Sequence, residues 1–184
     1  PGAPAFLFVA RRHLASSVSP LSGWMGHERP FDFVDGYAPA AGIERFLFGT
    51  THILSLLSLE CGVDLLLEAG NAALQAKSQR LCQLFITLVD EMCDGAQLRL
   101  LSPTDSRQRG RHLAYAHPNG YAVMRALIAR CVTGDFRAPD ILRFGFTPLY
   151  VGNAEVDRAA TILARIMAEG LWDRPAFKTR AKVT

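Results

Sequence analysis

The sequence lacks the short motifs that would assign it to a common enzyme class. It contains no Walker loop and no GxGxxG, GxSxG or HExxH motif, so simple nucleotide-binding, hydrolase and zinc-enzyme interpretations gain no support. The net charge of +3 is too small to indicate nucleic-acid binding. The longest apolar stretch, residues 53–67, is interrupted by Glu60 and Asp64 and is too short to span a bilayer.

Cysteine is scarce, with four residues that lie far apart: Cys61, Cys82, Cys93 and Cys131. They form no CxxC pair and have no metal-ligand spacing with histidine, so no metal site is expected. This pattern predicts reduced, buried thiols in a cytoplasmic protein.

The chain begins with Pro1 and a turn-forming segment that leads into the apolar run at residues 5–10. The run predicts a buried strand, and because a domain seldom begins in a turn before such a strand, we expect further chain upstream. The run has no basic lead-in and ends in two arginines, which argues against a signal peptide.

Nearly half of the residues are apolar, which predicts a packed core. Residues 20–52 are rich in turn formers and aromatics and indicate a loop that reaches a ligand or partner. A leucine-rich helix from residue 53 fills more than one face and should be buried nearly all round. Gly70 and Asn71 suggest a break before an amphipathic helix that ends at Asp94 and Gly95.

After residue 95, strands and helices alternate, which predicts a small α+β layer. Strands are expected at residues 98–100, 112–116, 131–132 and 141–146. Helices are expected at residues 120–130 and from Asn153, as its cap, onward. The basic tail after Trp172 is expected to be loose.

Three positions are candidates for binding chemistry. Arg143 lies in an apolar strand, where it would clamp a carboxylate or phosphate, face solvent through alternation, or form a structural ion pair. Trp24 lies between glycines, where its indole would contact a phosphate or an aromatic ligand, or fill a domain interface. Thr50 and Thr51 precede a helix and indicate either an anion site or an N-cap. The histidines His13, His27, His112 and His117 have no partner at a diagnostic spacing.

Three segments resemble the kynureninase family. Residues 23–28 read GWMGHE and are similar to the loop motif G-W-[FM]-G-H-E of that family. Residues 45–50 resemble the segment before its long helix, and residues 135–150 resemble its bacterial C-terminal signature. The resemblance runs from Pro1 to about Trp172, and the chain would start just after the family's cofactor-lysine motif.

The resemblance implies an α/β fold, namely the C-terminal part of a fold type I enzyme that uses pyridoxal 5'-phosphate (PLP). Residues 1–52 would end the large PLP-binding domain, and residues 53–94 would form long connecting helices. Residues 95–172 would form the small C-terminal α+β domain, followed by a basic tail at residues 173–184.

The resemblance also implies a reaction, the hydrolytic Cβ–Cγ cleavage of L-kynurenine to anthranilate and L-alanine in a cytoplasmic homodimer with shared active sites. Trp24 would donate to the PLP phosphate near the substrate ring, and Thr50 would reach that phosphate across the dimer interface. Arg143 would clamp the substrate α-carboxylate, and Gly49 would allow close backbone approach. Preference between kynurenine and 3-hydroxykynurenine, and a role in tryptophan degradation or NAD biosynthesis, stay open.

Two departures from the family pattern stand out. Thr51 and His52 replace the usual proline-containing start of the long helix. The cofactor lysine, which the family carries in a Y-K-x-L-N-G-G motif, would lie just before Pro1. The lysines Lys77, Lys178 and Lys182 fall in a surface helix and the basic tail, so we expect no catalytic residue in this chain and no activity from it alone. A truncated chain, half of a nicked enzyme and a broken reading frame remain open.

Two other hypotheses remain. One is a different fold type I lyase of the cysteine desulfurase kind, which needs a cysteine on a mobile loop, whereas Cys61, Cys82 and Cys93 are expected in helices. The other is a non-catalytic small domain, in which Trp24, Thr50 and Arg143 would have no evident use.

Overall fold

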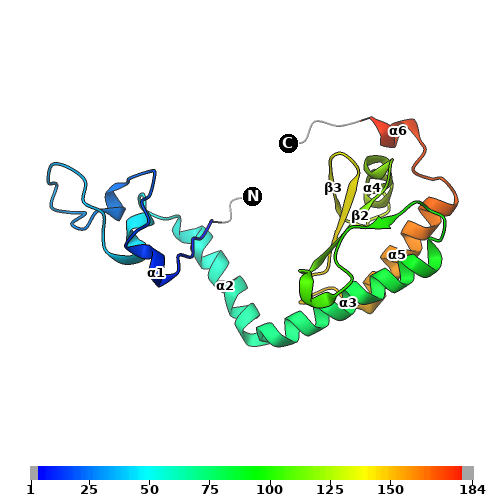
Figure 1. Cartoon of the computed structure of the whole chain (residues 1–184), viewed down its shortest axis with the longest axis horizontal. Helices are drawn as coiled ribbons and strands as arrows, with labels where there is room; N and C mark the ends of the chain where they lie inside the picture. Colours follow the sequence, from blue (N-terminus) through cyan, green and yellow to red (C-terminus); the bar gives the residue numbers. More distant parts are fainter. Residues whose placement is uncertain (1–3, 180–184) are drawn as a thin grey trace. The chain divides into compact units, whose positions relative to one another are not determined.

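The computed structural model describes residues 4–179, so the predicted turn at residues 1–3 and the end of the basic tail, with Lys182, lie outside the described residues. The chain packs into two units, one up to Glu68 and the other from Ala69 onward (Figure 1). We call them unit 1 and unit 2 and describe each by itself.

Unit 2 is built on a four-stranded antiparallel sheet in the order β1-β2-β4-β3. The strands are β1 (Arg99–Leu100), β2 (His112–Ala116), β3 (Asp135–Arg137) and β4 (Ile141–Gly145). Because successive side chains of a strand point to opposite faces, the apolar residues of β2 and β4 gather on one face. These residues are Leu113, Tyr115, Leu142 and Phe144, each at most 5% exposed.

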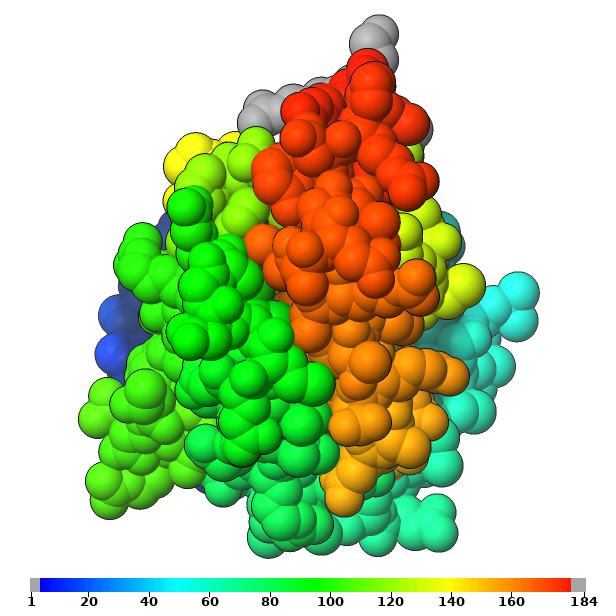
Figure 2. Space-filling view, turned by 90° about the vertical axis from the view of Figure 1, so that its right-hand side faces the viewer, coloured from blue at the N-terminus to red at the C-terminus, as the bar shows by residue number. Residues whose placement is uncertain are grey.

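Three helices supply the other half of the unit 2 core: α3 (Asn71–Met92), α4 (Gly120–Ile128) and α5 (Asn153–Ala168). Figure 2 shows α3 and α5 side by side, in green and orange. Phe85 of α3 is fully buried, and its ring centroid lies 4.9 Å from that of Phe144 and 5.4 Å from that of Phe146. The apolar stripe of α3 is therefore buried against the apolar face of the sheet.

The sequence predicted these helices well and their ends less well. The break at Gly70 is confirmed, since Gly70 has a φ of 73° between α2 (Ile53–Ala69) and α3. Asn153 is not the cap of α5. Gly152 holds the cap position, and its N–H donates to the Glu155 carboxylate at 2.9 Å.

Two other expectations for unit 2 were wrong. Cys131 lies in a turn, with a φ of 62°, and Val132 has no regular structure; the strand that follows is β3. The segment after Trp172 is not loose over its described part. It forms the short helix α6 (Pro175–Lys178), which packs on α4 and carries an ion pair between Lys178 and Asp173.

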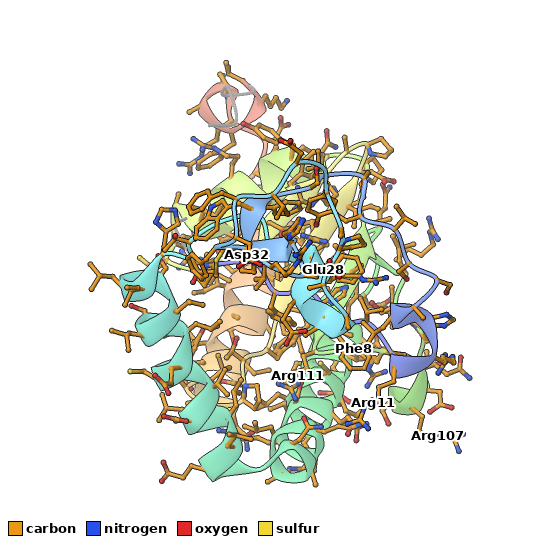
Figure 3. The ribbon with its side chains drawn as sticks, turned by 90° about the vertical axis from the view of Figure 1, so that its left-hand side faces the viewer. Phe8, Arg11, Glu28, Asp32, Arg107 and Arg111 are labelled. Atoms are coloured by element: carbon orange, nitrogen blue, oxygen red, sulfur yellow. The ribbon has the colours of Figure 1, made fainter. Side chains whose placement is uncertain are left out.

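Unit 1 consists mainly of irregular chain with short helices. These are α1 (Arg11–Leu14) and the 3-10 helices η1 (Trp24–Gly26) and η2 (Gly42–Phe46), and the long helix α2 follows them. A further 3-10 helix, η3 (Ser106–Gln108), belongs to unit 2. The strand predicted at residues 5–10 was wrong, because this segment, on which Figure 3 labels Phe8, has no regular structure. Phe8 is 84% exposed. A strand needs a neighbouring strand for its backbone hydrogen bonds, and residues 4–179 offer none to it.

Burial distinguishes the apolar helix α2 from the amphipathic helix α3 in a way that the sequence did not predict. No residue of α2 is buried, although a helix buried nearly all round was expected there. Among residues 4–68 only Gly26 is buried. Cys82 and Cys93 are buried as predicted, whereas Cys61 on α2 and Cys131 are exposed. Among the described helices, none is long and apolar enough to cross a membrane.

We predict that Phe85→Ala destabilises unit 2 by about 3–5 kcal/mol, because it removes the ring around which the aromatic residues of the core pack. Urea denaturation followed by far-UV circular dichroism measures this loss. Leu67→Ala, which truncates a side chain that is 74% exposed, is the control and should change stability little. Equal effects of the two substitutions would contradict the assigned core.

We also predict that unit 2 loses stability as the pH falls below about 6.5, the pKa of histidine in an unfolded chain. His117 is 4% exposed, and burial lowers the pKa of its imidazole. Its Nδ1 accepts the Asn119 N–H at 3.0 Å and its ring lies edge-on to Trp172. The unfolded chain therefore binds a proton before the folded chain does.

The measurement is thermal unfolding between pH 5 and 8, with His117→Gln as the comparison. The other histidines are common to both proteins, so the difference in slope below pH 6.5 reports on His117. Parallel pH profiles would show that His117 contributes nothing to the pH dependence.

Candidate functional site

The loop at residues 23–28, here called the Trp24 loop, contacts residues 47–49, which precede α2. Glycines make this close approach possible. A Cβ atom at Gly23 would overlap the Phe48 carbonyl oxygen. A Cβ atom at Gly26 would lie 2.6 Å from the Leu47 carbonyl oxygen. Both obstacles are backbone atoms, so any other residue would force the two segments apart. The two glycines of GWMGHE are thus required by packing.

Main-chain hydrogen bonds hold the far end of the same loop. The Glu28 N–H donates to the Ala38 carbonyl at 2.8 Å, and the Ala40 N–H donates to the Gly26 carbonyl at 2.9 Å. The Tyr37 hydroxyl donates to the same Gly26 carbonyl at 3.1 Å. Residues 26–40 therefore form a closed loop with Trp24 at its base.

Arg45 connects three parts of unit 1, a role that the sequence analysis missed. Its Nε donates to the Ala40 carbonyl at 3.0 Å. Its Nη1 donates to the carbonyls of Leu14, at 2.6 Å, and Ser17, at 3.1 Å. The only sequence signal was a single arginine in the otherwise largely apolar stretch at residues 42–49. Because the guanidinium has five N–H groups, one side chain can satisfy several loop carbonyls.

The structure brings Trp24 and the Gly49–Thr50 segment together. A Cβ atom at Gly49 would lie 3.5 Å from Trp24 Nε1, which is ordinary contact distance. Trp24 is 49% exposed, and its indole N–H donates to no acceptor within the described residues. Thr50 is exposed, and α2 begins only at Ile53, where the Leu56 N–H bonds the His52 carbonyl. Two side-chain donors thus lie on adjoining segments.

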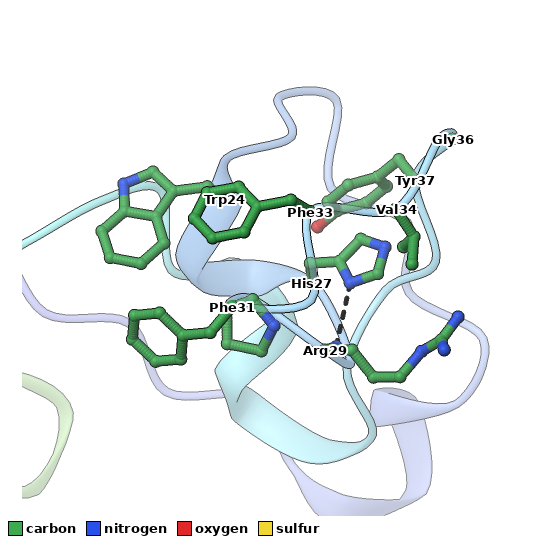
Figure 4. A pocket seen from close by; sticks show the side chains of 9 residues that line it. Trp24, His27, Arg29, Phe31, Phe33, Val34, Gly36 and Tyr37 are labelled. Atoms are coloured by element: carbon green, nitrogen blue, oxygen red, sulfur yellow. Dashed lines mark hydrogen bonds between the residues drawn. The ribbon is translucent and has the colours of Figure 1, made fainter.

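Trp24 also lines a pocket of about 560 Å³ in unit 1 (Figure 4). Its ring meets that of Phe31 edge-on, with centroids 5.6 Å apart. The His27 Nδ1 accepts the Arg29 N–H at 2.9 Å, which holds the imidazole at the wall. The lining residues also include Pro30, Phe33, Val34, Gly36 and Tyr37. Such an aromatic lining suits a flat ring, because aromatic pairs stack or meet edge-on.

Arg143 lies in unit 2, and the structure shows two of the alternatives that its sequence left open, a solvent-facing position and an ion pair. Leu142 and Phe144 point into the core, so alternation places Arg143 on the open face of the sheet, where its side chain is 35% exposed. Its Nε and Nη2 each donate to one Asp135 oxygen at 2.6 Å. These hydrogen bonds lower the pKa of Asp135 and raise that of Arg143.

The open face of the sheet is basic and lined by small residues around Arg143. Ala114 and Asp135 are its partners on the two neighbouring strands. By register, the same face carries Arg99, His112, Ala116, Arg137, Ile141 and Gly145. Three arginines against one aspartate on these strands leave the face positively charged, and the short side chains of Ala114 and Gly145 leave room for an anion.

Comparison with known proteins shows the family of the chain. Residues 74–163 match the family model described as the kynureninase C-terminal domain. The chain is 46% identical over all 184 residues to kynureninases of Burkholderia mallei (strain ATCC 23344) and Burkholderia pseudomallei (strain K96243). It is 44% identical over the same length to a kynureninase of Pseudomonas fluorescens. The chain belongs to the kynureninase family. It spans 44% of the length of each of these kynureninases.

The fold of this kynureninase-family chain recurs in a more distant protein. The apo structure of a cysteine desulfurase from Thermococcus onnurineus NA1 superposes with a TM-score of 0.72 at 16% identity. The match covers 88% of this chain and 42% of that chain. The predicted family and the predicted α/β fold of type I are confirmed. The site roles of Trp24, Thr50 and Arg143 stay predictions.

We predict that Gly23→Ala separates the Trp24 loop from the segment before α2, because the added methyl would overlap the Phe48 backbone. Hydrogen exchange of the Glu28 and Ala40 amides should then accelerate. Gly62→Ala is the control, since its Cβ would meet no atom within 4 Å in the middle of α2. Unchanged exchange in Gly23→Ala would contradict the requirement for glycine.

Proposed function

We propose that this chain supplies the phosphate-binding loop and the carboxylate-binding arginine of a PLP-dependent kynureninase. The reaction is the hydrolysis of the Cβ–Cγ bond of L-kynurenine, which yields anthranilate and L-alanine, in tryptophan catabolism. The observation that carries the proposal is the contact of the GWMGHE loop with the Gly49–Thr50 segment. Because the proposed reaction is a hydrolysis, the proposed enzyme class is that of the hydrolases.

The donors at this contact fit a phosphate group. Trp24 and Thr50 are exposed residues, and they offer one indole N–H and one hydroxyl as donors. Neither residues 23–26 nor residues 48–51 contain an acidic side chain that would compete for these donors. Neutral donors near the start of a long helix suit a phosphate dianion, because the helix N-terminus adds a partial positive charge. Bound there, PLP would supply the electron sink that the carbon–carbon cleavage needs.

Two further features, one in each unit, are proposed to act on the substrate. Arg143 holds the α-carboxylate by charge-assisted hydrogen bonds, which orients the amino acid. The aromatic pocket beside Trp24, with Phe31 on its wall, receives the aryl ring. A 3-hydroxykynurenine ring is the second candidate occupant, since the pocket carries polar groups at His27 and Arg29.

No lysine of the described chain is placed to bond the cofactor in this proposal. The Lys77 Nζ donates to the Pro148 carbonyl at 2.7 Å, and Lys178 pairs with Asp173. Both are held within unit 2 by these partners. We infer that the Schiff-base lysine belongs to the part of the kynureninase length that this chain does not span.

The proposed domain organisation follows from the same reasoning. Residues 1–52 would complete a large domain, residues 53–94 would connect it, and residues 95–172 would form the small domain. Within residues 4–68 only Gly26 is buried, so the apolar side chains of unit 1 need a covering surface. In the proposal that surface is the rest of the large domain and the second subunit of a homodimer. We propose a cytoplasmic location, which suits four free cysteines.

The test is anthranilate release from L-kynurenine by the complete reading frame supplied with PLP. We predict release by the unaltered protein and a fall in kcat/KM of roughly 100-fold in Arg143→Ala, since a charged bidentate contact to substrate is lost. Arg107→Ala is the matched control, because Arg107 is an exposed arginine that also pairs with an aspartate, Asp105.

Two outcomes would contradict the proposal. A folded, PLP-loaded protein that releases no anthranilate would move the assignment to another fold type I lyase. Near-normal hydrolysis by Arg143→Ala would remove Arg143 from the site while leaving the reaction in place.

A further inference from the structure

The ion pair between Asp135 and Arg143 uses only one edge of the guanidinium. Asp135 Oδ1 accepts from Nε and Oδ2 accepts from Nη2, each at 2.6 Å. Arginine has five N–H groups, so both Nη1 groups and the second Nη2 group stay outside this pair. Within residues 4–179 no other acceptor bonds Arg143. The edge formed by Nη1 and Nη2 is therefore the one that a second carboxylate can use.

From this geometry we propose that Asp135 is a positioning residue for Arg143. It holds the guanidinium plane by the Nε edge and thereby presents the other edge to the α-carboxylate of an amino-acid substrate. The inference rests on the proposed function and adds to it a residue that acts through Arg143 without touching the substrate.

The sheet itself sets this arrangement. Asp135 on β3 and Arg143 on β4 are direct cross-strand partners, so both backbone positions are fixed by the ladder. Directly opposite residues on one face of an antiparallel pair lie within side-chain reach. A guanidinium that is already oriented loses less conformational freedom when a ligand binds, which favours affinity.

The charges around the pair leave Arg143 able to bind a second anion. The Arg137 Nη2 lies 3.8 Å from Asp135 Oδ2. Arg137 and His112 both help to lower the pKa of Asp135, after the larger effect of Arg143 itself. The negative charge of Asp135 is thus shared between two arginines. On the other side of Arg143 the neighbouring residue is Ala114, whose methyl group does not block an incoming carboxylate.

The opposite hypothesis is that Asp135 competes with the substrate for Arg143. The two hypotheses predict opposite changes in KM. If Asp135 positions Arg143, Asp135→Asn raises KM because the guanidinium turns freely. If Asp135 competes, the same substitution lowers KM because the site is vacated. A purely structural aspartate would change stability and leave KM alone.

The experiment is steady-state hydrolysis of L-kynurenine by the complete, PLP-loaded protein. We expect Asp135→Asn to raise KM about tenfold with a smaller change in kcat, and Asp135→Glu to recover part of the loss because it keeps the charged acceptor. Asp105→Asn is the matched control, since Asp105 pairs with Arg107 in the same two-oxygen manner. An unchanged or lower KM in Asp135→Asn overturns the proposal.

A second measurement separates this inference from the proposed function. Side-chain NMR of the arginine N–H groups follows binding of L-alanine, which carries the α-carboxylate, to the same protein. If the unaltered protein hydrolyses nothing, the proposed function fails, and Asp135 is judged by this titration alone. Shifts of the Arg143 Nη signals that weaken in Asp135→Asn support positioning. Equal shifts in both proteins, or none in the unaltered protein, overturn it.

Discussion

Burial of one face of the β2–β4 pair is the constraint on which unit 2 depends. Phe85 of α3 packs on Phe144 and Phe146, and this contact selects which side of β4 is covered. Because side chains alternate along a strand, covering Phe144 necessarily turns Arg143 to the open face. The hydrophobic core and the basic face are consequences of one register. A shift of a single residue would bury Arg143 and expose the core side chains.

Unit 1 is organised by a different kind of contact. Its loops meet backbone against backbone, at Gly23 and Gly26, and Arg45 bonds carbonyls from two separate segments, at Ala40 and at residues 14–17. Polar and main-chain contacts of this sort define geometry well but bury little apolar surface. The leucines of α2 and the phenylalanines of the Trp24 loop stay exposed within the described chain. The geometry of the proposed phosphate site thus depends on main-chain contacts and on the covering surface that unit 1 needs.

Sequence patterns predicted the regular elements of unit 2 because its periodic residues are the ones that pack. Leu81 and Phe85 of α3, and Val156 and Leu163 of α5, repeat at helical spacing and are buried. The short strand β3 escaped prediction because two of its three residues are charged and its pairing with β4 is what makes it a strand. The apolar run at residues 5–10 shows the reverse: it has a strand composition and no strand partner among residues 4–179.

By itself the sequence determined the family, the order of most helices and strands, and the three candidate binding residues, since motifs and hydrophobic period are local properties of the chain. Tertiary structure alone decided that Arg143 faces outward beside Asp135, that Trp24 adjoins Gly49, and that α3 is buried while α2 is not. These depend on which distant segments meet. The more apolar helix, α2, is the exposed one, and the amphipathic α3 is buried because it has a sheet to cover; no local pattern records the presence of that partner.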